Sequence, residues 1–158
     1  MGRRIYVLFD YPSDMLIFSE MKSRCLAEDS DNYFYTADYD AGDKEINEKI
    51  YQGIMSSSLV IVLVNSNSKY LGGKYNFGIE TAVKSQKPLV VVNMNHERSL
   101  DIENCPMSLR GKFALHISND SSIINFAIKE WPSYYKENKG KNLHSMYLDD
   151  TIYKHFNL

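Results

Sequence analysis

Two short runs of aliphatic residues constrain the fold of this chain more than any other feature. Leu59–Val64 reads LVIVLV, residues 89–92 read LVVV, and neither run contains a polar residue. A strand that is apolar on both faces is typical of a parallel sheet covered by helices on each side, because neither face meets water. The two runs therefore predict the centre of a parallel sheet.

Three further strands are expected around these two. Residues 5–9 form another apolar run, and residues 112–117 are a plausible fourth strand. The aromatic residues 33–35 precede a polar stretch, so we interpret them as an edge strand that leads into a loop.

Segments of helical periodicity alternate with these strands. Ile46, Ile50 and Ile54 recur at four-residue spacing, which predicts one apolar stripe along a helix over roughly 45–56. The other expected helices cover residues 15–26, the segment around Ile79 that stops before Pro88, and residues 124–131, which Pro132 is expected to end.

Strict alternation of strand and helix forces parallel strands with right-handed crossovers. We therefore expect an α/β domain over residues 1–135, with a flavodoxin-like, doubly wound parallel sheet of five strands in the order 2-1-3-4-5. Residues 136–142 read KENKGKN. We interpret residues 136–158 as a polar linker followed by a C-terminal tail.

Charge and cysteine content narrow the function classes. Eighteen Lys and Arg against twenty Asp and Glu give a net charge of -2, which disfavours binding to nucleic acid. Cys25 and Cys105 lack companions at the spacing of a disulfide scaffold or a metal site. The longest apolar run is Leu59–Val64, far short of the ~20 residues that cross a bilayer. We expect a cytoplasmic protein without a metal, a membrane span or a nucleic-acid partner.

A doubly wound sheet binds ligands beyond the carboxyl ends of strands one and three. The corresponding loops are residues 10–14 and the long, polar, glycine-containing residues 65–76. A loop of that length in a small domain is more often functional than idle. The chain has no Gly-x-Gly-x-x-Gly and no P-loop motif, which disfavours dinucleotide reduction and ATP hydrolysis.

Glu80 is the candidate catalytic residue. It follows Ile79 on the expected helix, at the border between buried and wet surface, and we expect it to point into the crevice. A carboxylate there is suited to stabilising the positive charge that develops on a ribose when its glycosidic bond breaks. The alternative is a surface glutamate that only interacts favourably with the helix dipole or forms an ion pair with Lys84.

The candidate binding residues come from the same loops and the start of the same helix. The aspartates among them could bind a ribose hydroxyl or a cation, or could only stabilise a turn and a helix start. The aromatic residues could stack on a base, although twelve tyrosines place several near any loop by chance. The candidates are Phe9, Asp10, Tyr11, Asp14, Asn65, Ser66, Ser68, Tyr75 and Phe77.

Several of these segments resemble TIR-like domains of the bacterial Thoeris antiphage type. The similar segments are residues 4–11 with Asp14, residues 46–66, and residues 75–92, which contain Glu80 at the place of the family's catalytic glutamate. Leu8 stands where a small polar residue is common, and Tyr75 and Phe77 stand near the place of a tryptophan or cysteine.

The resemblance implies an enzyme that uses NAD as substrate and needs no further cofactor. It implies release of nicotinamide and conversion of the ADP-ribose moiety into a cyclic or conjugated signal for a separate defence effector. Members of such a family often assemble as homo-oligomers.

Two alternatives remain open at this stage. Residues 77–82 followed by 87–89 are similar to the nucleophile segment of nucleoside deoxyribosyltransferases, in which a glutamate attacks the sugar of a nucleoside. The other alternative is a non-enzymatic TIR-like adaptor that oligomerises through the aromatic residues 147–156 or through a sheet edge.

Overall fold

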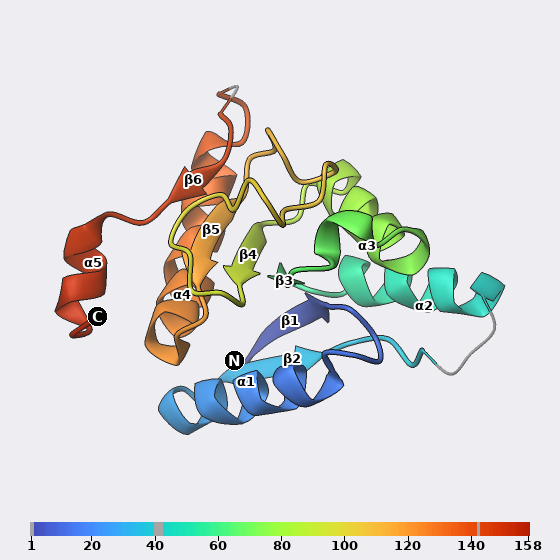
Figure 1. Cartoon of the computed structure of the whole chain (residues 1–158), viewed down its shortest axis with the longest axis horizontal. Helices are drawn as coiled ribbons and strands as arrows, with labels where there is room; N and C mark the ends of the chain where they lie inside the picture. Colours follow the sequence, from blue (N-terminus) through green and yellow to red (C-terminus); the bar gives the residue numbers. More distant parts are fainter. Residues whose placement is uncertain (1, 40–42, 142) are drawn as a thin grey trace.

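A computed structural model describes residues 2–39, 43–141 and 143–158 of the chain. Within these ranges all strands belong to one parallel sheet, with the order β2-β1-β3-β4-β5-β6 (Figure 1). The strands are β1 (Arg3–Leu8), β2 (Asn32–Tyr35), β3 (Leu59–Val64), β4 (Leu89–Asn93), β5 (Leu115–Ser118) and β6 (Met146–Tyr147).

The doubly wound sheet predicted from the two aliphatic runs is confirmed. These runs form β3 and β4, and every residue of both strands is buried. The order of the first five strands is also the predicted one, and β6 extends the sheet to a sixth strand beyond β5. The order reverses between β1 and β3, which places the switch point of the winding between these two strands.

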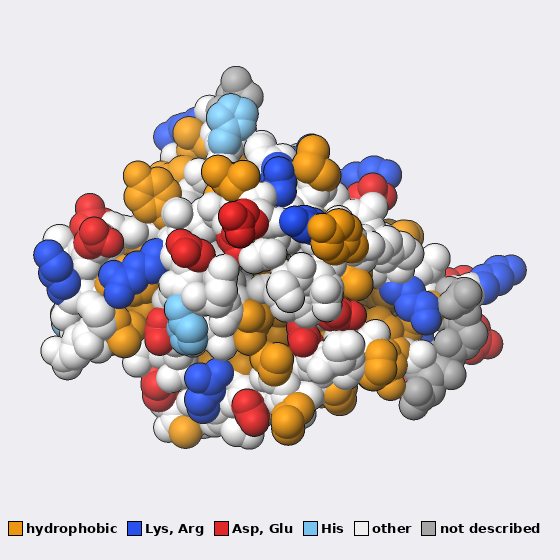
Figure 2. Space-filling model, viewed as in Figure 1, with side chains coloured by type: hydrophobic (Ala, Val, Ile, Leu, Met, Phe, Trp, Pro, Cys, Tyr) orange, Lys and Arg blue, Asp and Glu red, His pale blue; other side chains and the backbone are white. Residues whose placement is uncertain are grey.

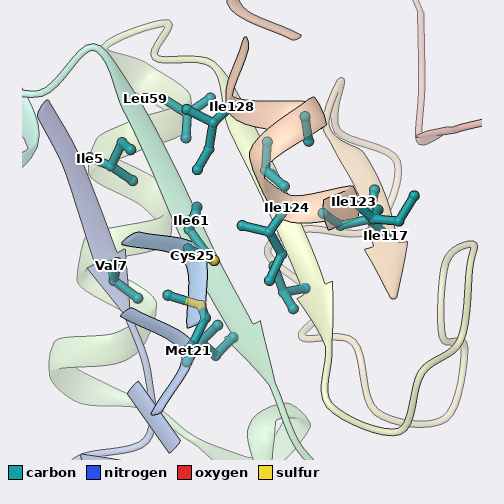
Figure 3. Close-up of a cluster of buried hydrophobic side chains, with 14 of the residues drawn as sticks. Ile5, Val7, Met21, Cys25, Leu59, Ile61, Ile117, Ile123, Ile124 and Ile128 are labelled. Atoms are coloured by element: carbon teal, nitrogen blue, oxygen red, sulfur yellow. The ribbon is translucent and has the colours of Figure 1, made fainter. Parts of the chain in front are cut away.

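Helices cover both faces of the sheet (Figure 1). One face packs against α1 and α4, and Figure 3 shows Met21 and Cys25 of α1 and Ile124 of α4 gathered around Ile61. The other face packs against α2 and α3. The helices are α1 (Met15–Glu28), α2 (Asp43–Met55), α3 (Gly73–Lys84), α4 (Ser121–Asn138) and α5 (Asp150–His155), with a 3-10 turn η1 at Ser68–Tyr70.

Pro132 does not end the fourth helix as predicted, because α4 continues through it to Asn138. A proline inside a helix removes one backbone hydrogen bond. On both sides of Pro132, however, α4 keeps its apolar face against the core, since Trp131 and Tyr135 are buried. Burial of these two large rings outweighs the loss of one hydrogen bond.

Residues 136–158 are not an appended tail, and the boundary predicted at residue 135 falls inside α4. Met146 pairs with Leu115 of β5. Tyr153 is fully buried in the core, and its hydroxyl accepts a hydrogen bond from the backbone N–H of Ser118 at 3.2 Å. Much of the aromatic surface that we considered for oligomerisation is thus used within the chain.

None of the helices in the described ranges combines the length and the apolar character needed to cross a bilayer.

Candidate functional site

A cleft of about 470 Å³ opens where the loop after β1 meets the start of α3. We call it the switch-point cleft, because it lies beyond the carboxyl ends of β1 and β3, at the predicted place. Tyr39, which follows β2, and Asn47 of α2 close its other side. The complete lining is Phe9, Asp10, Tyr11, Tyr39, Asn47, Leu71, Gly72, Gly73, Lys74 and Tyr75.

Aromatic rings form one wall of the cleft. The rings of Tyr11 and Tyr39 are stacked, with centroids 4.6 Å apart and an interplanar angle of 14°. Phe9 supports this pair from the core, because its ring lies 6.1 Å from Tyr39 and stacks on Phe18 at 5.1 Å. Since Tyr11 is exposed and Phe9 is buried, the wall presents an aromatic surface on a fixed base.

Two carboxylates share one amide beneath this wall. The Nδ2 of Asn65 donates to Asp14 Oδ2 at 2.7 Å and lies 3.3 Å from Asp10 Oδ2. Asn65 is itself held by Ser68, whose Oγ accepts the backbone N–H of Asn65 at 2.8 Å. This network connects the loop after β1 with the loop after β3.

The two aspartates differ in exposure. Asp10 lines the cleft and is half-buried, whereas Asp14 is only 5% exposed. Burial raises the pKa of Asp14, the nearby charge of Asp10 raises it further, and the hydrogen bond from Asn65 opposes this shift. Asp14 occupies the N-cap position of α1 without capping it. The Asp14 carboxylate instead accepts the hydrogen bond from Asn65, whereas Asp10 faces the cleft.

The start of α3 forms the opposite wall. Gly72 is the N-cap residue and provides no side-chain hydrogen bond to the first turn. Gly73 has a φ of +50° and open space where a Cβ would lie, a conformation that glycine adopts without strain. The N–H groups at a helix start bind anions well, because they lack partners within the helix and carry the positive end of its dipole.

Tyr75 fixes this helix start against the sheet. Its hydroxyl donates to the backbone carbonyl of Leu63 at 3.0 Å, and its ring is buried while lining the cleft. Burial raises the pKa of Tyr75. Tyr75 is therefore a neutral positioning residue for α3.

Glu80 does not line the switch-point cleft, so the predicted direction of its side chain is wrong. It is exposed, accepts a hydrogen bond from Asn76 Nδ2 at 3.2 Å, and lines a separate depression with Arg110 and Lys112. The physical reason is the helical phase. α3 turns Gly78 and Ile79 toward the sheet, and a step of about 100° per residue carries the next side chain away from it.

The other predicted residues divide into three groups. Phe9, Asp10, Tyr11 and Tyr75 line the cleft. Asp14, Asn65 and Ser68 form the network behind it. Ser66 is exposed and Phe77 lines a different depression between α2 and α3, so neither belongs to the cleft lining.

Sequence reasoning missed Tyr39 and Asn47. Tyr39 follows the edge strand β2, whose carboxyl end lies at the same side of the sheet as those of β1 and β3. The rule that ligands bind beyond the carboxyl ends of the strands could therefore have identified Tyr39. Asn47 is an exposed polar residue of α2, and no local pattern distinguishes it from its neighbours.

No protein-family model and no curated protein matches the chain. Among solved structures, it is similar to a conserved protein from Enterococcus faecalis V583, with a TM-score of 0.59 and 13% identity over 82% of this chain and 99% of the other. It is also similar to a 3-dehydroquinate dehydratase-like protein from Bifidobacterium longum, with a TM-score of 0.51 and 12% identity over 85% of this chain and 98% of the other. At such identities the similarity establishes the α/β fold alone.

Proposed function

We propose that the protein binds a nucleotide in the switch-point cleft. The observation that carries this proposal is the combination of three chemistries in one cavity. These are the carboxylate of Asp10, the stacked rings of Tyr11 and Tyr39, and the glycine start of α3.

Each of these groups matches one part of a nucleotide. A carboxylate accepts hydrogen bonds from the hydroxyls of a ribose. An aromatic surface stacks on a base or a nicotinamide ring. A helix start without a side-chain cap donates N–H groups to a phosphate, and Lys74 beside it adds positive charge. NAD is the candidate ligand that the resemblance to TIR-like domains provides.

Calorimetric titration with NAD, ADP-ribose and AMP tests the proposal, with ribose 5-phosphate and nicotinamide as partial ligands. We expect Asp10→Asn to weaken nucleotide binding about tenfold or more, because hydrogen bonds to a charged group contribute roughly 1.5–3 kcal/mol. Glu80→Gln is the matched control, since it neutralises a carboxylate outside the cleft. Absence of binding by all three nucleotides, or weakening by Glu80→Gln alone, would refute the proposal.

Cleavage of NAD is a second candidate function, favoured by the presence of Asp10 beside the aromatic wall. In this reaction nicotinamide leaves with the electron pair of its bond to the ribose. Asp10 stabilises the positive charge on the sugar until a hydroxyl group or water attacks and loses its proton. The cyclic or conjugated ADP-ribose signal, its effector and a role in antiphage defence all depend on this step.

Chromatographic measurement of nicotinamide release tests the second candidate. Nicotinamide release that Asp10→Asn abolishes and Glu80→Gln preserves would support NAD cleavage. Tight NAD binding without nicotinamide release would refute cleavage and support nucleotide binding alone. We also propose a cytosolic location, since Cys25 and Cys105 are free thiols, as is usual in a reducing compartment.

A further inference from the structure

A second pocket, of about 240 Å³, lies between α4, β6 and α5. We call it the C-terminal pocket. It shares no lining residue with the switch-point cleft. The segment that we had expected to be a tail therefore builds a cavity of its own.

Aromatic and aliphatic side chains form most of the walls of the C-terminal pocket. Trp131 and Tyr134 of α4 are stacked, with centroids 5.5 Å apart and an interplanar angle of 24°. Phe113 packs edge-on against Trp131, with ring centroids 5.1 Å apart, and this contact holds the indole in place. Tyr147 of β6 also lines the pocket and is 68% exposed, so its ring stays accessible to a ligand.

The charges of the C-terminal pocket have one sign. Glu130 and Asp149 line it, and no Lys, Arg or His of the described residues is among its lining. Asp149 caps α5 by accepting the backbone N–H of Thr151 at 2.9 Å, and this hydrogen bond lowers the pKa of Asp149. Figure 2 shows hydrophobic side chains over β6 and acidic side chains next to them at the start of α5.

We propose that the C-terminal pocket binds a small organic cation of the quaternary or methylated ammonium class. The faces of aromatic rings carry negative charge density and attract cations, and the ring of Tyr147, which lines the pocket, is exposed. The apolar walls, which include Met146 and Ile152, receive the methyl groups, and the carboxylates of Glu130 and Asp149 balance the charge. The cavity is too small for more than a compact ligand, since drug-sized sites occupy roughly 300–1,000 Å³.

Fluorescence titration tests this proposal, because Trp131 is the single tryptophan of the chain. The probes are choline and its neutral isostere 3,3-dimethylbutan-1-ol, which have nearly the same shape and differ in charge. We expect a saturable change of Trp131 emission with choline and at least tenfold weaker binding of the isostere. Equal binding of both probes, or no saturable change with choline, would overturn the proposal.

Two variants locate the interaction. Glu130→Gln should weaken choline binding several-fold and leave binding of the isostere unchanged, and Tyr147→Ala should weaken choline binding without unfolding the protein, because Tyr147 is exposed. Glu137→Gln is the matched control, since Glu137 is an exposed acid of the same helix outside the pocket. Loss of binding in the control, or full binding in Glu130→Gln, would contradict the assigned site. Thermal unfolding of each variant verifies its fold.

Discussion

The side chain of Leu8 in β1 fills the space in front of Gly78 in α3. A Cβ placed on Gly78 would lie 2.8 Å from Leu8 Cδ1 and closer still to Cδ2. Leu8 is fully buried, so an aliphatic group closes the point where α3 crosses β1. The single acidic residue of α3, Glu80, lies on the exposed side. The carboxylates near the cleft therefore come from the loop after β1.

The close packing of Leu8 and Gly78 predicts a strong dependence of each residue on the other. Gly78→Ala should lower the free energy of unfolding by roughly 1–3 kcal/mol, because overpacking forces buried side chains out of their rotamers. Adding Leu8→Val should recover part of that loss, which urea denaturation of the two single variants and the double variant would measure. Strictly additive effects would mean that the two side chains do not compete for the same space.

Asp14 should reduce stability near neutral pH. Its pKa is raised in the folded protein above the ordinary 3.8, so the folded state favours the protonated form more than the unfolded state does. The free energy of unfolding is therefore reduced at pH 7. This reduction decreases as the pH falls through the raised pKa of the folded state, and it disappears below the pKa of the unfolded state.

Asp14→Asn is the test of this reduction, since the new amide oxygen can accept the same hydrogen bond from Asn65. We expect the variant to be more stable than the natural protein at pH 7, with a difference that shrinks toward pH 4. The measurement is urea denaturation at several pH values. A difference that does not vary with pH would contradict the predicted effect.

His116 should show the opposite dependence on pH. It is fully buried in β5, neither ring nitrogen has a hydrogen-bond partner among the described residues, and burial lowers its pKa from 6.5 to about 4. The unfolded state therefore binds a proton more readily, and stability falls as the pH drops from about 6.5 to about 4. His116→Leu should abolish this loss, which is roughly 3 kcal/mol at about 1.4 kcal/mol per pKa unit.

Unfolding of the natural protein and the His116→Leu variant between pH 7 and 4 measures the difference. The control is His155→Gln, which changes an exposed histidine of α5. Parallel pH profiles for the natural protein and His116→Leu would exclude His116 as the titrating group.

Tyr153 should anchor the C-terminal segment to the sheet. Tyr153→Phe removes the hydroxyl that accepts the N–H of Ser118, and an unsatisfied buried donor costs about 1–3 kcal/mol. Chemical denaturation should show that loss in a single transition shared with the rest of the chain. If residues 143–158 instead unfolded in a separate, earlier transition, they would not be part of the common core.

The sheet and the position of the cleft were predictable because they depend on local patterns. A run such as Leu59–Val64 can be buried on both faces only inside a parallel sheet covered by helices, and the order of the elements then places the switch point. Asp10 and Tyr11 follow directly from that rule, since they lie in the loop that follows β1. Tyr75 also follows from it, at the start of the helix after β3.

The directions of single side chains and the contacts of distant segments were not predictable in the same way. The sequence places Ile79 and Ala82 correctly on the buried face of α3, but Glu80, about 100° further round than Ile79, lies on the exposed side. Its direction depends on how α3 packs on the sheet, with Gly78 against Leu8. The two-residue strand β6 is too short to leave a periodic pattern. Hydrophobic periodicity is local information about burial, whereas Tyr39 beside Tyr11 and Tyr153 beside Ser118 arise when segments far apart in the chain pack together.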